Sequence, residues 1–126
     1  MDTDAEGLHS VLTEDIIGAA FSVHNELGCG LLEKVYETAL AWELHLRRHR
    51  VSTQAEFNVT YKQKEVGLYY ADLVVDGKVI VEVKSADGLT DVHRAQLLNY
   101  LRISGLRVGL LLNSAKPKLR FERLMV

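Results

Sequence analysis

Apolar residues recur at helical spacing through the first part of the chain. Thr13 followed by two acidic residues is typical of a helix N-cap, and the apolar spacing continues to Leu27. The Gly-Cys-Gly sequence at 28–30 is expected to end this helix, because glycine takes the left-handed C-cap conformation without strain. A second helix is predicted from about Leu31 to His49. Its apolar stripe is expected to consist of Leu32, Val35, Ala39, Trp42 and Leu46.

The pattern changes to that of β-strands beyond Val51. Apolar residues there either alternate with polar residues or form continuous runs, and polar turns separate the runs. Three consecutive antiparallel strands are therefore predicted, within residues 55–62, 65–75 and 78–84.

A third helix and two further strands are predicted in the remainder of the chain. Thr90 or Asp91 is expected to cap a helix over residues 92–104. Residues 107–113 are expected to form a buried strand, and residues 118–126 a strand at the edge of the sheet. The element order is then α-α-β-β-β-α-β-β. A strand, a helix and another strand of the same sheet indicate a crossover, and hence a mixed α/β sheet flanked by helices.

Length and composition fit one globular domain. The chain has 126 residues, of which 48% are hydrophobic and 25% charged, and the domain is expected to span 11–126 after a flexible tail at 1–10. No apolar run approaches the roughly 18 residues of a membrane span, and the acidic N-terminus lacks the apolar core of a signal peptide. Cys29 is the single cysteine, which excludes an internal disulfide and favours a cytoplasmic location.

The net charge of −2 argues against a strongly basic surface for nucleic acid. Two local basic segments remain, at 47–50 and 116–123, and each is also what an ordinary solvated face looks like.

Three ionisable residues interrupt the most strand-like segment. Asp72, Glu82 and Lys84 lie among the valines of residues 71–85, and burying an unpaired charge is costly. Alternation along a strand places Glu82 and Lys84 on one face. This pattern is therefore either a site or an ordinary ion pair on an exposed face.

The turn between the second and third strands decides whether Asp72 joins Glu82. A two-residue Asp-Gly turn would pair position 75 with 78 and send the two carboxylates to opposite faces. A three-residue loop with Gly77 in the left-handed conformation is expected to put Asp72 opposite position 80, with Glu82 as its diagonal neighbour. A common site requires the second register or a bulge elsewhere.

Converging carboxylates would have a specific chemistry. Asp72, Glu82 and the main-chain carbonyl of Val83 would offer oxygen ligands to a hard divalent ion such as magnesium. Lys84 would add a positive charge beside a metal-bound water and a phosphate.

Helical positions supply further candidates. Glu33 and Glu37 share a stripe of the second helix, where solvated glutamates are the plain alternative. Gln96 and Tyr100 share a stripe of the third helix, where they either flank the core or reach the end of the third strand. His24 lies on the apolar side of the first helix, which is typical of a core histidine.

Together these segments resemble the GxxExxY proteins of the PD-(D/E)xK nuclease superfamily. GLLEKVYE at 30–37 matches the GxxExxY signature through Gly30, Glu33 and Tyr36. The blocks VHNELGCGLLEKVYETAL, YYADLVVDGKVIVEVKS and RAQLLNYLRISGLRVGLLLN follow that family in order, over about residues 11–125. The resemblance implies a restriction-endonuclease-like core.

The resemblance also implies roles for individual residues. Asp72 and Glu82 resemble the two acidic metal ligands, and Lys84 resembles the catalytic lysine. Gln96 and Tyr100 match the QxxxY element of exonuclease-like members. The resemblance makes Glu33 the helix glutamate of the acidic centre, with Glu37 as a neighbour able to share that role, and adds His24 to the metal shell. Ala71 stands where many members have proline before the first acid.

The resulting expectation is a nuclease that uses Mg²⁺ or Mn²⁺ to hydrolyse phosphodiester bonds of nucleic acid, with DNA as the expected substrate. The alternative is a catalytically inactive module on the same fold that binds nucleic acid or protein. The small size of the domain favours action as a homodimer or with a protein partner.

Overall fold

The computed structural model describes residues 7–126. The tail predicted at 1–10 therefore lies mostly outside the described residues, and residues 7–9 precede the first helix. The predicted order of helices and strands is confirmed. The elements are α1 (Ser10–Leu27), α2 (Glu33–Leu46), β1 (Val51–Tyr61), β2 (Lys64–Val75), β3 (Val79–Lys84), α3 (Asp91–Ser104), β4 (Val108–Asn113) and β5 (Arg120–Met125).

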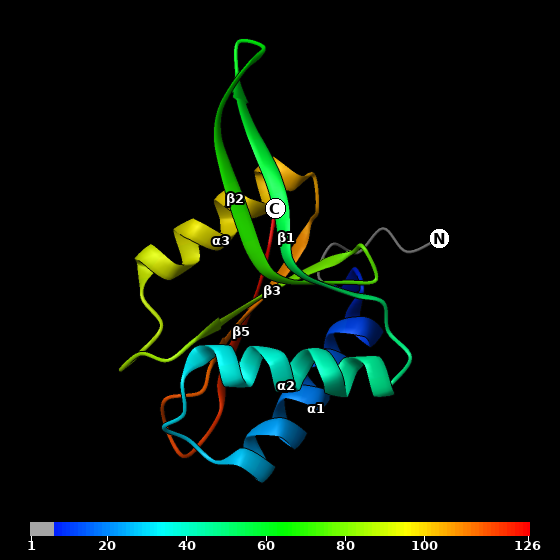
Figure 1. The fold of residues 1–126 in the computed structure, drawn as a ribbon, viewed down its shortest axis with the longest axis vertical. Helices are drawn as coiled ribbons and strands as arrows, with labels where there is room; N and C mark the ends of the chain where they lie inside the picture. The colour runs from blue at the N-terminus through cyan, green and yellow to red at the C-terminus, as the bar shows by residue number, and fades with distance from the viewer. Residues whose placement is uncertain (1–6) are drawn as a thin grey trace.

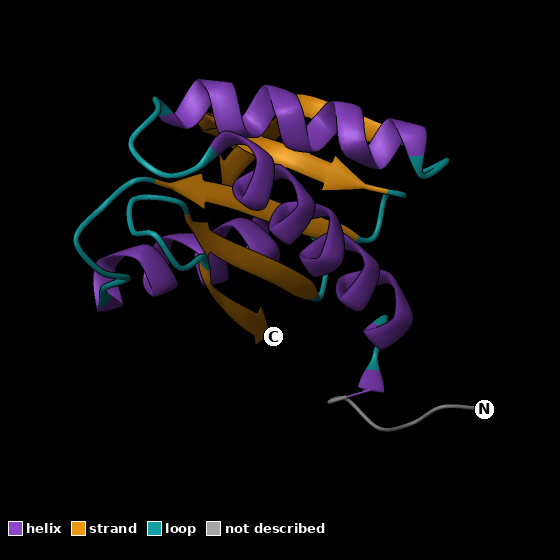
Figure 2. Cartoon of the chain, turned by 90° about the horizontal axis from the view of Figure 1, so that it is seen from below, coloured by secondary structure: helices purple, strands orange, loops and turns teal. Residues whose placement is uncertain are grey.

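The five strands form one mixed sheet in the order β1-β2-β3-β4-β5 (Figure 1). Neighbouring strands are antiparallel except β3 and β4, which are parallel and joined through α3. One apolar cluster joins the sheet to α1 and α2, and a second joins it to α3. Helices thus cover both faces of the sheet (Figure 2), as the sequence predicted.

The first helix begins three residues before the predicted N-cap. α1 starts at Ser10, after His9, and Thr13 lies inside its first turn. The Thr13 side chain is buried, and its hydroxyl donates to the Ser10 carbonyl at 3.1 Å instead of capping the helix. Leu8 and Leu12 pack against the core, which draws this first turn into the helix. The predicted end is confirmed, since α1 ends at Leu27 with Gly28 as its C-cap. Gly28 has φ 75° and ψ −176°, so its backbone is not in the left-handed helical conformation expected from the sequence.

The apolar stripe predicted for the second helix is not the buried one. Leu32 is 77% exposed, Trp42 61% and Leu46 58%. The helix carries a second apolar stripe beside the predicted one, and the sheet and α1 cover that second stripe. The residues buried on that covered stripe are Tyr36, Glu37, Leu40 and Leu44.

The third helix is held close to the sheet. Thr90 caps α3 and accepts a hydrogen bond from the His93 amide at 3.3 Å, as predicted for one of two candidate caps. Gly109 of β4 lies directly beneath Leu97, so that a Cβ at this position would come within 2.8 Å of the Leu97 side chain. The glycine therefore sets the distance between α3 and the sheet.

The turn between β2 and β3 has the three-residue form. Val75 pairs with Val79, and Gly77 has φ 65°. The expectation that Asp72 faces position 80 is wrong. Because the ladder runs from Val75↔Val79 to Leu73↔Val81, its continuation places Asp72 opposite Glu82 itself.

Contacts from the chain after α2 fix this turn. The Asp76 carboxylate accepts from the His49 Nδ1 at 2.8 Å and from the Arg50 amide at 2.8 Å. His49 also bonds the Asp15 carboxylate of α1, and this bond raises the pKa of His49. The strand register therefore depends on residues distant in the sequence.

The strands β2 and β3 separate at Asp72. Leu73↔Val81 is the last backbone pair between them. Ala71 packs in the cluster under α3, whereas Leu73 packs in the cluster under α1 and α2, so β2 rotates between these two residues. The neighbouring strand is distorted at the same level, where Gln54 has φ 49°. Beyond this point β1 and β2 continue as a hairpin that projects from the molecule (Figure 1).

Candidate functional site

Two carboxylates occupy the point where β2 leaves β3. The Asp72 amide donates to Glu82 Oε2 at 2.7 Å, and the Val83 amide donates to Asp72 Oδ2 at 2.8 Å. Each carboxylate thus accepts a hydrogen bond from a backbone amide that has no partner on the neighbouring strand, because β2 and β3 have separated there. This is the structural reason for acidic residues in the valine-rich segment, and it holds the two acids together.

Burial makes the acidic pair electrostatically unusual. Glu82 is 4% exposed. Burial and the neighbouring Asp72 charge raise the pKa of Glu82 to about 8, and burial also raises the pKa of Asp72. The Lys84 ammonium lowers both pKa values, but not enough to reverse the shifts. Lys84 therefore offsets the negative charge of the pair only in part, and a bound cation would offset more of it.

Lys84 and the third helix form the side of the site next to the acids. Lys84 Nζ donates to Gln96 Oε1 at 3.2 Å. Tyr100 follows Gln96 by one helical turn and is 8% exposed. Burial and the Glu82 charge raise the pKa of Tyr100, which keeps its hydroxyl protonated at neutral pH. The structure thus brings Lys84, Gln96 and Tyr100 to the same region as the acidic pair.

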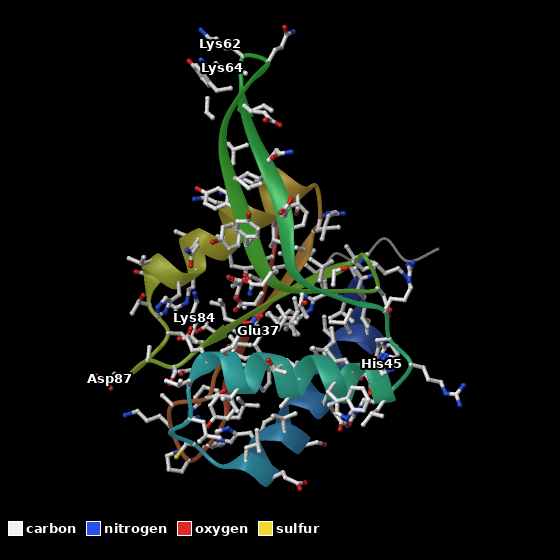
Figure 3. All side chains as sticks on the ribbon, in the orientation of Figure 1. Glu37, His45, Lys62, Lys64, Lys84 and Asp87 are labelled. Carbon is white, nitrogen blue, oxygen red and sulfur yellow. The ribbon has the colours of Figure 1, made fainter. Side chains whose placement is uncertain are left out.

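The second helix brings two glutamates to the opposite side. Glu33 Oε2 accepts from the Ser85 amide at 2.7 Å, directly after Lys84. Glu37 is 5% exposed, and its charge raises the pKa of both Asp72 and Glu82. Figure 3 shows Glu37 and Lys84 near the middle of the molecule. The second helix therefore adds negative charge to the site from Glu37 as well as Glu33.

His24 is not brought to the acidic pair. Its Nε2 lies 3.0 Å from the carbonyls of both Lys116 and Pro117. The ring lines a small cavity with the side chain of Val83, which points to the opposite face of β3 from Glu82. The sheet thus separates the imidazole from the carboxylates, and its burial is that of a core histidine.

Two residues near the site were not predicted from the sequence. Gln54 Nε2 donates to Glu37 Oε1 at 2.8 Å from the distorted part of β1. The Tyr69 ring lies 4.9 Å from the Tyr100 ring. Neither position carries a periodic or motif signal, because both depend on where β1 and β2 twist away from the sheet.

The side chains at the site supply part of the ligand set that a hard divalent cation takes. Among residues 7–126, no three or more His, Cys, Asp or Glu side chains are placed to hold a metal ion. Asp72 and Glu82 remain as a pair. One or two carboxylates and several waters are what Mg²⁺ takes. Burial and the Asp72 charge raise the pKa of Glu82, and a nearby cation would lower it.

The fold and these residues define a class of protein: a mixed α/β sheet with two acids and a lysine where two central strands part. A family model of the PD-(D/E)XK nuclease superfamily matches residues 10–124. The chain therefore belongs to the PD-(D/E)XK nuclease superfamily, whose members act on nucleic acid and generally depend on divalent metal ions.

A solved structure shares this fold. "Crystal structure of SSO0001" superposes with a TM-score of 0.56 at 18% sequence identity. The match covers 96% of this chain and 60% of that chain, so the present chain spans less than two thirds of its structural relative. No curated protein matches the chain. None of the helices in residues 7–126 is long and apolar enough to cross a membrane.

Proposed function

We propose that the chain is a nuclease that hydrolyses phosphodiester bonds of DNA with the help of Mg²⁺ or Mn²⁺. The observation that carries the proposal is the pair of half-buried Asp72 and buried Glu82 where β2 and β3 separate, with Lys84 two residues further along the same face of β3. Asp72, Glu82 and the Val83 carbonyl would hold the ion. A bound divalent ion supplies Lewis-acid stabilisation and a water of lowered pKa.

Lys84 is proposed as the catalytic lysine. Its hydrogen bond to Gln96 holds the ammonium beside the acids, where it would offset negative charge developing on the phosphate. Gln96 positions Lys84, and the protonated Tyr100 hydroxyl is available as a hydrogen-bond donor to the substrate or to a carboxylate.

The two helix glutamates would act differently. Glu33 holds the Ser85 amide and so fixes the chain directly after Lys84. Glu37 is the buried one, and its charge acts on both acids of the pair. We propose that Glu37 strengthens cation binding through its charge and that Glu33 does so at closer range once an ion and its waters are bound. His24 is left out of the metal shell.

We also propose that the chain is one of the GxxExxY proteins. The signature has a local structural reason in this chain. Gly30 has φ 94°, which permits the turn between α1 and α2. The Tyr36 hydroxyl donates to the Gly28 carbonyl and accepts from the Leu31 amide, which fixes that turn. Glu33 is thereby aimed at Ser85, at the end of β3.

We also propose that a second copy covers the exposed stripe of α2. The positions in this stripe are spaced alternately by three and four residues, as in a coiled-coil seam. They are Leu32, Val35, Ala39, Trp42 and Leu46. In an antiparallel pair of helices, Ala39 of one copy would face Trp42 of the other, and Val35 would face Leu46. A smaller side chain of one helix would thus pack against a larger side chain of the other on both sides of the twofold axis.

Cleavage assays test the proposed nuclease. Purified protein with Mg²⁺ or Mn²⁺ is expected to cleave DNA, assayed beside matched RNA oligonucleotides, and Lys84→Ala is expected to lower the rate by a factor of about 10² or more. Lys78→Ala, an exposed lysine in the turn between β2 and β3, is the matched control and should leave the rate unchanged. Wild-type protein that cleaves neither polymer, or Lys84→Ala that cleaves like wild type, would exclude the proposal.

The second candidate is a module that binds nucleic acid without cleaving it. It is favoured by the absence of a third acid at ligand distance within the described residues. Binding of an oligonucleotide that stays intact in the presence of Mn²⁺ would select this function.

A further inference from the structure

The hairpin beyond Asp72 projects from the body of the protein and carries its side chains in solvent. We call residues 56–70 the arm. Within it only Phe57 and Val59 are half-buried, and all other residues are exposed. A two-stranded hairpin with no covered face gains little stability from packing. Phe57 packs against the cluster under α3, but the exposed apolar and aromatic residues of the arm are not explained by the core.

Three of the five tyrosines of the chain lie on this arm. Tyr61 is 63% exposed, Tyr70 46% and Tyr69 39%. Tyr69 is the one next to the candidate site, because its ring lies 4.9 Å from that of Tyr100 at an interplanar angle of 53°. Tyr100 is one helical turn from Gln96, which bonds Lys84. An exposed aromatic ring thus stands beside the proposed reaction centre.

The charges of the arm distinguish two kinds of nucleic acid. Lys62 and Lys64 are balanced by Glu56 and Glu65, and both lysines lie at the tip (Figure 3). A β-ribbon in the major groove of a duplex contacts phosphates of both strands and needs positive charge along its length. Aromatic side chains instead bind unpaired bases, whose faces are free to stack. The exposed tyrosines and balanced charges of the arm therefore favour binding of unpaired bases over binding of a duplex.

We propose that the arm binds single-stranded nucleic acid, with one base stacked on Tyr69 and phosphates close to Lys62 and Lys64. Lys64 is eight residues from Asp72 along β2, which corresponds to roughly 26 Å of extended strand. The arm would thus guide a strand toward the acidic pair from that distance. This inference rests on the proposed function, since it takes the bound strand to be the substrate of the adjacent site.

Binding in the absence of metal tests the arm separately from catalysis. The probe is a fluorescent oligo(dT) of about 20 nucleotides, longer than one such binding path, followed by fluorescence anisotropy in EDTA. Tyr69→Leu is expected to weaken binding about tenfold. Tyr70→Leu is the matched control, because it is the adjacent tyrosine with similar exposure on the other face of the strand. It should change binding less than twofold.

A second variant tests the tip, far from the core. Lys62→Ser combined with Lys64→Ser is expected to weaken oligo(dT) binding and to reduce its dependence on salt. A duplex of the same length is expected to bind at least tenfold more weakly than oligo(dT). The inference is overturned if Tyr69→Leu binds oligo(dT) like wild type, or if duplex binds as tightly as the single strand.

The outcomes separate this inference from the proposed function. Cleavage that depends on Lys84, together with oligo(dT) binding that is indifferent to Tyr69, removes the arm's role and keeps the nuclease. Binding that depends on Tyr69 without any cleavage keeps the arm and leaves a binding module.

Discussion

Asp72 and Glu82 serve the fold and the proposed chemistry at the same time. Their carboxylates accept the Val83 and Asp72 amides where the strands part, so the backbone needs polar side chains at these positions. The two carboxylates lie close together, and the Lys84 charge offsets their negative charge only in part. A cation would relieve the resulting repulsion, which links the local fold to metal binding.

The raised pKa of Glu82 predicts a pH dependence of stability in metal-free protein. The pKa rises from 4.5 to about 8 on folding, so the folded state holds the proton more tightly than the unfolded state. Glu82 therefore contributes stability that is fully present below pH 4.5 and is lost as the pH rises through about 8.

Glu82→Gln is expected to remove this dependence. Relative to wild type, the melting temperature of the variant should be similar near pH 5 and several degrees higher near pH 9, where Glu82 is charged in wild type. Glu65→Gln, on the exposed arm, is the control. An equal effect of Glu82→Gln at both pH values would contradict the raised pKa.

At the scale of the elements, the closest contact is that of α3 with β4. A Cβ on Gly109 would overlap the buried Leu97 side chain at 2.8 Å. Gly109→Ala is expected to destabilise the protein by about 1–3 kcal/mol, because α3 must move away from the sheet. Gly88→Ala has no heavy atom within 4 Å of the added Cβ and should be close to neutral. Denaturant unfolding of both variants measures the difference, and equal midpoints would refute the contact.

Much of the element order followed from the sequence, because strand and helix periods differ and Thr90 and Gly28 mark helix ends. The buried face of α2 did not follow. Apolar residues on two stripes make the period ambiguous, and only packing against α1 and the sheet decides between them. The register at Asp72 was likewise undetermined, since it depends on the contact of His49 with Asp76.

Much the same holds for the candidate site. The motif residues could be named from the sequence, because Asp72, Glu82 and Lys84 stand out in an apolar strand. The position of His24 across the sheet and the proximity of Tyr69 to Tyr100 could not. Both arise from the way separate elements pack, and no local pattern encodes that arrangement.

At the scale of the whole molecule, the exposed stripe of α2 predicts self-association. Trp42 is 61% exposed and lies on the face of α2 away from the sheet. Trp42→Ser is expected to shift the protein from dimer to monomer in light scattering coupled to size exclusion, because the large side chain at the centre of the seam is lost. Val11→Ser removes another exposed apolar side chain, 80% exposed on α1, and should leave the mass unchanged. A monomeric wild type would exclude the dimer.

The central claim is that Asp72 and Glu82 together form a cation site. Its most direct test is the melting temperature of the protein with and without Mn²⁺ near pH 8. Wild type is expected to gain about 2–3 kcal/mol of stability at an ion concentration of about one hundred times Kd. Asp72→Asn should lose this gain, whereas Asp87→Asn, on an exposed loop, should keep it. A wild-type protein that Mn²⁺ does not stabilise, or an Asp72→Asn variant stabilised equally, would contradict the account.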